Sequence, residues 1–232
     1  YKERKKEMCV LPIRDPLQAV LNSIVAYLYA KMQCKHMHLI KQQEVLLVLR
    51  GYYTKKELFT FFSSILGNTG HFEDFVMNKR VKRPPDNPIN ALVSFGNTLL
   101  YTKTISAIYQ THLDQRISFL HEPSEGRFSL SLDLSEVFKP VIVFRTIFDL
   151  VNNHRLQVEK HFEKNVNYCI LNEEGRKIFV KAFEERMESV FEHSRLKRKV
   201  TYRTALKLDC YKLIKNILED KEFVPFLLKE GM

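Results

Sequence analysis

Three side chains within residues 119–140 could together bind a divalent metal ion. His121 follows a short apolar lead-in, and the acidic residues Asp133 and Glu136 end an alternating run. If residues 117–132 form a hairpin that leads into a helix, His121 returns near the two acids, which share one helix face because they are three residues apart. An imidazole nitrogen and carboxylate oxygens can hold Mg²⁺ or Mn²⁺, and such an ion polarises a phosphodiester and activates a hydroxyl. The alternative for the same residues is a solvated turn followed by a helix cap.

The net charge of the chain favours a polyanionic partner. Thirty-seven Lys and Arg residues outnumber 27 Asp and Glu residues, for a formal net charge of +10. Such an excess of positive charge is typical of nucleic-acid binding, although a basic surface without a specific partner is the alternative. The basic residues predicted to contact a DNA backbone are clustered at 79–83, including Lys82 and Arg83, and at 195–199, with Arg203 and Lys207 beyond.

Hydrophobic periodicity predicts an all-α helical bundle with one short β-hairpin. The run 89–112 is apolar on most faces, which is typical of a central, buried helix. From Asp133 the period becomes helical, and Pro140 inside that run must kink the helix or mark its first turn. The alternating stretch 117–132 predicts the hairpin. Further helices are predicted at 17–33, 38–49, 54–67, 71–78, 173–191 and 200–219.

A basic, proline-rich connector at 79–88 divides the chain. Its three prolines cannot lie inside one regular helix. We therefore expect an N-terminal helical part over 1–82 and a helical catalytic core over 83–232.

The cysteines and the apolar stretches favour a cytoplasmic location. The four cysteines are widely spaced and form no C-x-x-C pair, so reduced thiols in a cytosolic protein are the simplest interpretation. No segment approaches the roughly 18 consecutive apolar residues of a membrane span.

Longer motifs in the chain resemble a known nuclease family. They are NPINALVSFGNTLLY at 87–101, FLHE at 119–122, GRFSLSLDLSEVFKPVIV at 126–143 and LNEEGRKIFVKAFEERM at 171–187. These segments resemble the CRISPR-associated endonuclease that integrates new spacers, which is the larger of the two universal adaptation proteins. The resemblance is strong over about 83–218 and looser over 16–82.

The resemblance implies a fold, a metal site and partners. The family has an N-terminal β domain, which we expect this chain to lack, and an all-α catalytic domain that binds Mg²⁺ or Mn²⁺ through a Glu, a His and a further acid. The family His matches His121, the further acid matches Glu136, and Asp133 matches a nearby family Asp. Family members cut branched DNA and join 3′-OH ends to the CRISPR repeat. They work as homodimers bridged by a small ferredoxin-like partner.

One position departs from the family pattern. The first metal ligand of the family is a Glu in a Gly-x-Glu-Gly turn, and the matching turn here, GNTG at 67–70, carries Thr69 instead. A neutral hydroxyl cannot replace a carboxylate as a hard-metal ligand, so an impaired, DNA-binding member is the alternative to an active enzyme. Glu73, one helical turn on, or Asp133 could supply the missing charge.

Several other residues are predicted to contact DNA. Tyr101 would face the active-site pocket of the family, and its alternative is a core aromatic whose hydroxyl is satisfied. Arg127, Lys139 and Arg145 flank the acids, where phosphate contact is plausible and solvation at the surface is the alternative.

Overall fold

The computed structural model describes the fold of residues 75, 81, 83–118, 126–165, 167–193, 196–219, 223 and 226. Within these ranges the chain is mainly helical, as predicted, but it contains two small antiparallel hairpins rather than one. The expected absence of an N-terminal β domain and the predicted helices before residue 79 fall outside these ranges, apart from the single residue 75. The elements in chain order are α4 (Pro88–Tyr109), α5 (Ser129–Phe138), the π-helix η3 (Lys139–Phe144), α6 (Arg145–Asn152), α7 (Val158–His161), β1 (Phe162–Asn165), β2 (Tyr168–Leu171), α8 (Glu173–Glu188), β3 (Val190–His193), β4 (Arg198–Thr201) and α9 (Tyr202–Glu219).

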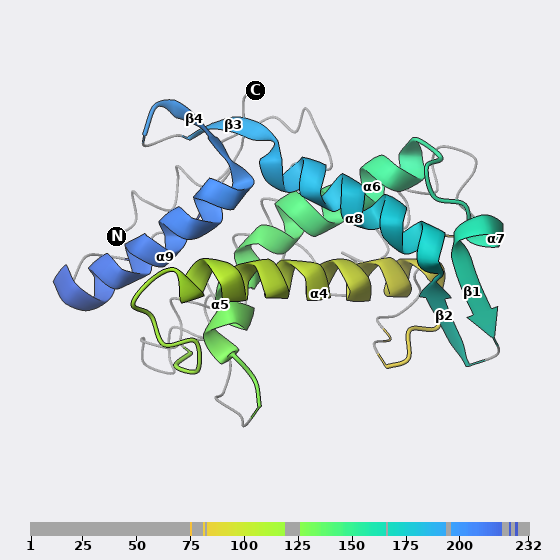
Figure 1. Cartoon of the computed structure of the whole chain (residues 1–232), viewed down its shortest axis with the longest axis horizontal. Helices are drawn as coiled ribbons and strands as arrows, with labels where there is room; N and C mark the ends of the chain where they lie inside the picture. Colours follow the sequence, from red (N-terminus) through yellow and green to blue (C-terminus); the bar gives the residue numbers. More distant parts are fainter. Residues whose placement is uncertain are drawn as a thin grey trace, which may run out of the picture.

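Helix α4 is the central helix that the sequence predicts. It starts sharply because the Asn87 side chain accepts a hydrogen bond from the Asn90 backbone N–H at 2.9 Å, and Pro88 suits the first turn. Figure 1 shows α4 crossing the molecule, with α8 and α6 along one side and α5 on the other. The hairpin β1–β2 lies near the N-terminal end of α4, and α9 lies near its C-terminal end.

Gly96 allows α4 to approach its neighbours closely. A Cβ atom at this position would lie 2.6 Å from Val143 Cγ1 of η3 and 3.0 Å from Phe179 Cζ of α8. Both distances are shorter than ordinary van der Waals contact, so any larger side chain must push η3 or α8 away. Gly96 is therefore a position where the missing side chain permits close packing of α4 against η3 and α8.

The predicted hairpin over 117–132 is wrong in its second half. Residues 129–132 form the first turn of α5, which begins four residues before Asp133. Leu130 and Leu134 are one helical turn apart and both are buried against Ile108 of α4 and Cys210 of α9. The alternating serines are buried as well, so an alternation that indicates a half-exposed strand belongs here to a helix enclosed on both sides.

Helix α5 continues through η3 into α6 without a break. The chain turns more widely at Pro140, which lacks a backbone N–H and so cannot complete a regular α-helical hydrogen-bond ladder. Arg186 of α8 donates from Nε to the Val141 carbonyl at 2.9 Å, so a side chain from another helix satisfies an acceptor in the widened segment. The predicted disturbance at Pro140 is therefore a π-helical segment, a feature often found near functional sites.

Two hairpins, each made of two four-residue strands, were not predicted from the sequence. Strands β1 and β2 pair from Phe162 with Leu171 to Asn165 with Tyr168. Strands β3 and β4 pair from Val190 with Thr201 to His193 with Arg198. The helices predicted at 173–191 and 200–219 are consequently shorter, because their outer residues belong to β3 and β4. Strands of four residues are too short to show a clear period of two.

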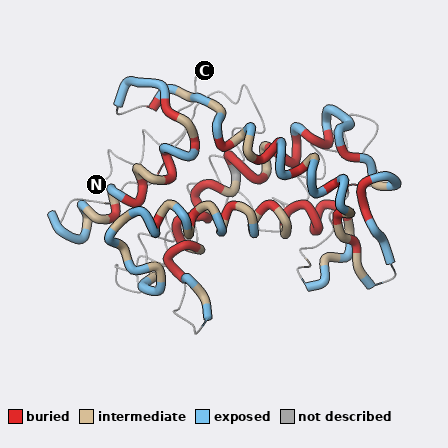
Figure 2. The backbone as a smooth tube through the Cα atoms, in the orientation of Figure 1, coloured by how far each residue is buried: buried red, intermediate tan, exposed pale blue. Residues whose placement is uncertain are grey.

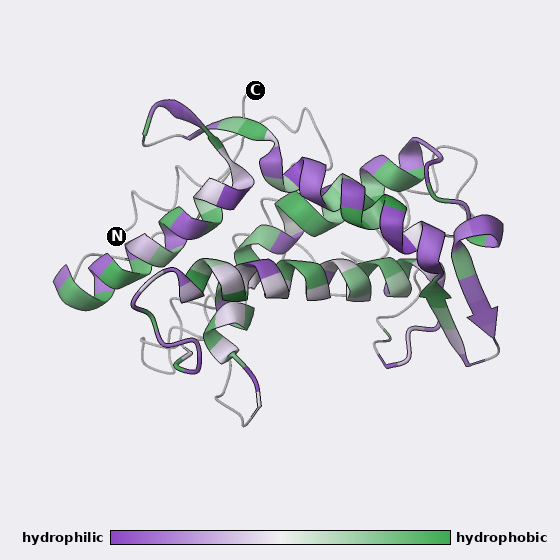
Figure 3. Ribbon diagram, viewed as in Figure 1, coloured by the Kyte–Doolittle hydropathy of each residue, from purple (hydrophilic) through white to green (hydrophobic). Residues whose placement is uncertain are grey.

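The main hydrophobic core lies between α4, η3, α6 and α8. Figure 2 shows the run from α5 through η3 to α6 as mainly buried, whereas the outer face of α8 is exposed. Figure 3 shows the same contrast in hydropathy, with α4 largely apolar and α8 banded with hydrophilic residues. No helix in the described ranges has both the length and the apolar character that crossing a membrane requires.

Candidate active site

Helix α5 carries the two predicted acidic residues on adjacent turns. Asp133 has no solvent-exposed surface, whereas the Glu136 side chain keeps 24 % of its surface exposed. Three residues along an α-helix correspond to a rise of about 4.5 Å, so both side chains lie on neighbouring positions of one face. The structure therefore confirms that Asp133 and Glu136 share a helix, although that helix begins earlier than predicted.

The Glu136 carboxylate forms an ion pair with the Lys139 ammonium. Lys139 follows three residues later, at the start of η3, and its side chain is 18 % exposed. Phosphate contact was predicted for this lysine, but in the structure its ammonium neutralises the acid beside it. A divalent cation bound to Glu136 would take over that neutralising role, because it supplies the positive charge itself.

Tyr101 fixes the start of α5. Its hydroxyl oxygen accepts a hydrogen bond from the Phe128 backbone N–H at 3.1 Å. Phe128 is the N-cap residue of α5, and no side chain caps that helix. The tyrosine is half-buried, so the satisfied hydroxyl considered as the alternative reading is observed, and it connects α4 to the helix that carries the acids.

The predicted basic residues do not all lie in one place. Arg127 immediately precedes Phe128 and is half-buried, so it lies at the start of α5. Arg145 is the first residue of α6. Burial raises the pKa of the Tyr202 hydroxyl, and the charges of Arg186 and Arg145 oppose that rise. Arg83 is exposed before the first turn of α4, and Tyr101 lies about 20 Å further along that helix. Arg83 therefore lies far from Tyr101 and from the start of α5, which Tyr101 contacts.

The described residues include two candidate metal ligands, the expected Glu136 and the possible substitute Asp133. Carboxylate oxygens of Asp133 and Glu136 suit a hard divalent cation such as Mg²⁺ or Mn²⁺. Across the described part of the chain, no group of three or more His, Cys, Asp or Glu side chains gathers at one point. Four residues singled out in the sequence lie outside the described ranges. They are the expected ligand His121, the possible substitute Glu73, Thr69 at the position of the family Glu, and the DNA-binding candidate Lys82.

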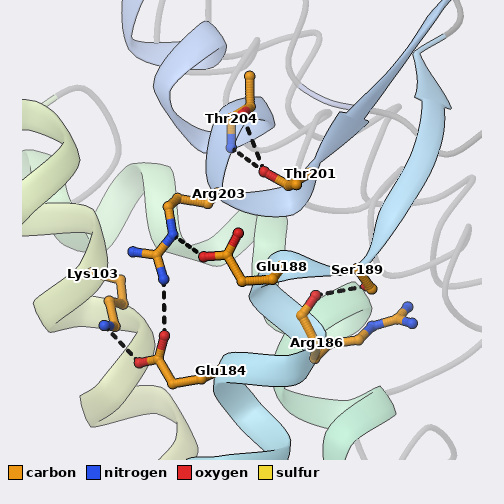
Figure 4. Close-up of polar contacts among 8 residues, drawn as sticks. All are labelled: Lys103, Glu184, Arg186, Glu188, Ser189, Thr201, Arg203 and Thr204. Carbon is orange, nitrogen blue, oxygen red and sulfur yellow. Dashed lines mark hydrogen bonds and ion pairs between the residues drawn. The ribbon is translucent and has the colours of Figure 1, made fainter.

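A second group of charged residues ties three helices together, as Figure 4 shows. Glu184 of α8 pairs with Lys103 of α4 at 2.6 Å and with Arg203 of α9 at 2.9 Å. Arg203 also pairs with Glu188 at 2.5 Å. Arg203 was grouped with the DNA-contacting cations in the sequence, but in the fold two carboxylates neutralise it.

Other residues that support α5 could not be identified from the sequence. Phe226 stacks on Phe138, the last residue of α5. Asp209, 1 % exposed, accepts a hydrogen bond from the Phe226 backbone N–H. The sequence shows only that Asp209 is a charged residue among apolar neighbours in a helix. That pattern does not indicate that its partner is the Phe226 backbone N–H.

The fold and these side chains define a helical domain that presents two carboxylates on a helix held by its neighbours. The sequence model of the family described as CRISPR associated protein Cas1 matches residues 17–185. The chain belongs to this family. The matched range includes α4, α5, η3, α6 and most of α8, and it also extends across the boundary expected near residue 82.

Individual relatives agree with the family match. The chain is 50 % identical over 159 residues to CRISPR-associated endonuclease Cas1 3 of Thermodesulfovibrio yellowstonii, covering 68 % of this chain and 49 % of that protein. It is 47 % identical over 169 residues to CRISPR-associated endonuclease Cas1 of Clostridium perfringens, covering 73 % and 49 %. The chain thus spans about half the length of the curated relatives it matches.

Solved structures show the same fold. A Cas1 protein from Thermotoga maritima superposes with a TM-score of 0.66 at 34 % identity, covering 87 % of this chain and 64 % of that one. A casposase bound to its integration product gives a TM-score of 0.69 at 19 % identity, covering 93 % and 68 %. The casposase is too distant in sequence to indicate more than a shared fold.

Proposed function

We propose that this chain is the helical catalytic part of a DNA endonuclease and integrase that inserts spacers into a CRISPR array. The observation that carries the proposal is α5: the family match covers it, and it presents Asp133 and Glu136 on one face beside Lys139. The reaction would cleave phosphodiesters and transfer a strand from a 3′-OH end. The net charge of +10 suits a DNA partner.

Glu136 and His121 would hold Mg²⁺ or Mn²⁺, with Asp133 or Glu73 in place of the missing family Glu at Thr69. When bound, the ion would polarise the scissile phosphate and lower the pKa of the attacking hydroxyl. Within the described site, Tyr101 holds the start of α5. The carboxyl groups of the buried Asp133 and the half-buried Glu136 would attract a cation to this helix.

The cations around α5 would position the DNA backbone. Arg127 and Arg145 lie on either side of the acids in the chain. Lys139 pairs with Glu136, and its ammonium would become available to phosphate if a metal ion took its place there. The tip of the β3–β4 hairpin adds exposed Lys197, Arg198 and Lys199, which Figure 3 shows as a hydrophilic end.

The partners proposed for the whole protein follow the family. They are protospacer and CRISPR-repeat DNA, a second copy of the chain, and a small ferredoxin-like adaptation protein, all in the cytoplasm. Two distant structures of the same fold are a Cas6-RT-Cas1–Cas2 complex and a partial form of it, each under 20 % identical. At such low sequence identity the likeness indicates a common fold alone. The proposed partners therefore rest on family membership.

A second candidate function follows from Thr69. A member with a neutral residue at the family Glu would bind DNA and partners while cutting and joining poorly. The sequence of the turn GNTG favours this reading.

The two functions separate in a joining and cleavage assay. The chain is incubated with a 3′-OH oligonucleotide, branched DNA and Mn²⁺, beside Thr69→Glu and His121→Ala variants. Activity of the unaltered chain that His121→Ala abolishes supports the integrase. Activity of Thr69→Glu alone supports the impaired member. Activity that survives His121→Ala, both in the unaltered chain and when combined with Thr69→Glu, contradicts the proposed metal site.

A further inference from the structure

The C-terminal end of α5 is covered by one aromatic ring from far along the chain. The rings of Phe226 and Phe138 are stacked, with centroids 5.2 Å apart and planes inclined by 10°. Phe138 has no exposed surface and Phe226 only 4 %. Because Phe138 is two residues after Glu136 and directly precedes Lys139, this contact lies at the base of the proposed site.

A buried carboxylate holds Phe226 in place. The Phe226 backbone N–H donates to Asp209 Oδ2 at 2.8 Å, and Lys212 Nζ lies 2.6 Å from Asp209 Oδ1. Asp209 lies on α9 and is 1 % exposed. A buried carboxylate is tolerated only when it is paired or hydrogen-bonded, so the Phe226 N–H is part of what makes this position possible.

Neighbouring aromatic residues extend the contact back to η3. Phe191 lies edge-on to Phe226 at 5.2 Å and contacts Tyr202 at 4.7 Å. The Arg186 guanidinium lies 4.8 Å from the centre of the Tyr202 ring and donates to the Val141 carbonyl. The end of α5 and the start of η3 are therefore held from two directions, by Phe226 and by Arg186.

We propose that Phe226 is a positioning residue, which sets the C-terminal end of α5 and thereby the Glu136 carboxylate and the Lys139 ammonium. Asp209 anchors Phe226 through its backbone N–H. This inference rests on the proposed function, because it assigns Phe226 a role in the reaction at Glu136.

The geometry of α5 gives the physical reason. It begins without a side-chain N-cap and passes at Phe138 directly into the wider turns of η3, so contacts with other parts of the fold must set where its last turn lies. Tyr101 fixes one end and Phe226 the other. A displacement of about 1 Å at reacting groups can cost about a hundredfold in rate, so loss of either support should appear in the chemical step.

The test compares four variants of the 232-residue chain with the unaltered chain. Phe226→Ala removes the stacked ring, Asp209→Ala removes the acceptor for the Phe226 N–H, and Asp209→Asn keeps an oxygen acceptor there. The matched control is Leu171→Ala, a buried core truncation in β2, which Figure 1 places at the opposite end of the molecule from α9.

Two readouts are taken on each variant at a temperature where it is folded. The first is the DNA-joining rate at saturating DNA together with the half-saturating DNA concentration, both with Mn²⁺. The second is amide hydrogen exchange over residues 134–142, which reports the order of the α5 end without any need for activity.

We expect Phe226→Ala and Asp209→Ala to lower the saturating rate about ten- to hundredfold while the half-saturating concentration stays within about twofold. Exchange over 134–142 should quicken in both. Asp209→Asn should restore most of the rate, and Leu171→Ala should leave rate and exchange near those of the unaltered chain. If Phe226→Ala does not fold, the two Asp209 variants decide the matter.

The inference is overturned if exchange over 134–142 is unchanged in Phe226→Ala or Asp209→Ala, or if Leu171→Ala loses as much rate as they do. A second outcome is that neither the unaltered chain nor Thr69→Glu joins DNA while exchange responds as expected. The proposed function then fails, and the role of Phe226 in the reaction fails with it. The support that Phe226 gives to α5 is upheld in that case. If joining is normal and only the exchange result is absent, the proposed function stands and the inference alone fails.

Discussion

Helices α5 and α8 each present acidic side chains, but cations neutralise them in different ways. On α8, Glu184 and Glu188 meet Lys103 from α4 and Arg203 from α9, so these ion pairs join three helices. On α5, Glu136 pairs with Lys139 from the next turn of its own helical run. An ion pair between elements holds the fold together, whereas a local pair only balances charge. In the proposed function, Glu136 would therefore exchange its Lys139 partner for a metal ion with little effect on the fold.

The largest effect on DNA joining should come from neutralising Glu136 on α5, and Glu184 on α8 provides the comparison. Glu136→Gln should lower DNA joining at least about a hundredfold, because a proposed metal ligand is lost, while DNA binding stays within about threefold by the salt-sensitive phosphate contacts that remain. Glu184→Gln should leave the joining rate within about twofold, since that carboxylate acts in the scaffold. Equal losses in both variants would show that the two helices do not differ in role. The measurements are single-turnover joining and fluorescence anisotropy.

A smaller effect is expected from removing the local cation. Lys139→Met should tighten Mn²⁺ binding about fivefold, because an ion pair worth about 1 kcal/mol no longer competes for Glu136. The measurement is the rise in unfolding temperature with Mn²⁺ concentration, which reports binding to the native state.

The matched control for this experiment is Lys177→Met. Lys177 pairs with Glu173 at 2.7 Å in the first turn of α8, and both side chains are well exposed. Its loss should leave Mn²⁺ affinity unchanged. Weaker Mn²⁺ binding in Lys139→Met than in the unaltered chain would contradict the view that Lys139 competes with the metal.

A third acidic residue, the buried Asp209 of α9, should make the stability of the fold depend on pH. Burial raises the pKa of Asp209 above its ordinary value of 3.8, although Lys212 and the Phe226 N–H oppose the shift. The native state then holds this proton more tightly than the unfolded state, so this group's contribution to stability rises as the pH falls through the native pKa and diminishes above it.

Asp209→Asn removes that titration. The free energy of unfolding of the unaltered chain, relative to Asp209→Asn, should therefore increase as the pH is lowered from 8 towards about 4. Urea denaturation at a series of pH values measures the difference. A difference that is constant or reversed in sign would show that the Asp209 pKa is not raised in the native state.

The smallest effect should come from the cation that joins α8 to α9. Arg203→Gln should lower the free energy of unfolding by about 0.5–1 kcal/mol, because its two carboxylate partners are partly exposed and screened by solvent. The loss should shrink at 1 M salt, where the Debye length is about 3 Å. Arg116→Gln, whose partner is Asp114 in an exposed turn, should change stability less. A loss above about 2 kcal/mol would mean that these pairs are better desolvated than their exposure indicates.

Long periodic segments were predictable because their local signals agree with their packing. The apolar run at 89–112 became α4, with Asn87 and Pro88 supplying its start. Short segments were not predictable. The alternation in SLSLDL formed a helix because α4 and α9 bury Leu130 and Leu134 together, and four-residue strands at Val190–His193 and Arg198–Thr201 took residues from predicted helices.

By itself, the sequence determined the family, the helical class and the identity of the acids on α5, because long motifs and a period of 3.6 residues need no knowledge of distant contacts. Only the tertiary structure decided which cations neutralise which acids, that Tyr101 and Phe226 hold the two ends of α5, and that Arg203 belongs to the scaffold. Apart from the local pair of Glu136 with Lys139, these contacts join residues from 15 to almost 90 positions apart, as with Arg203 to Glu188 and Phe138 to Phe226. No local pattern encodes such pairings, since they form only when packing brings separate helices together.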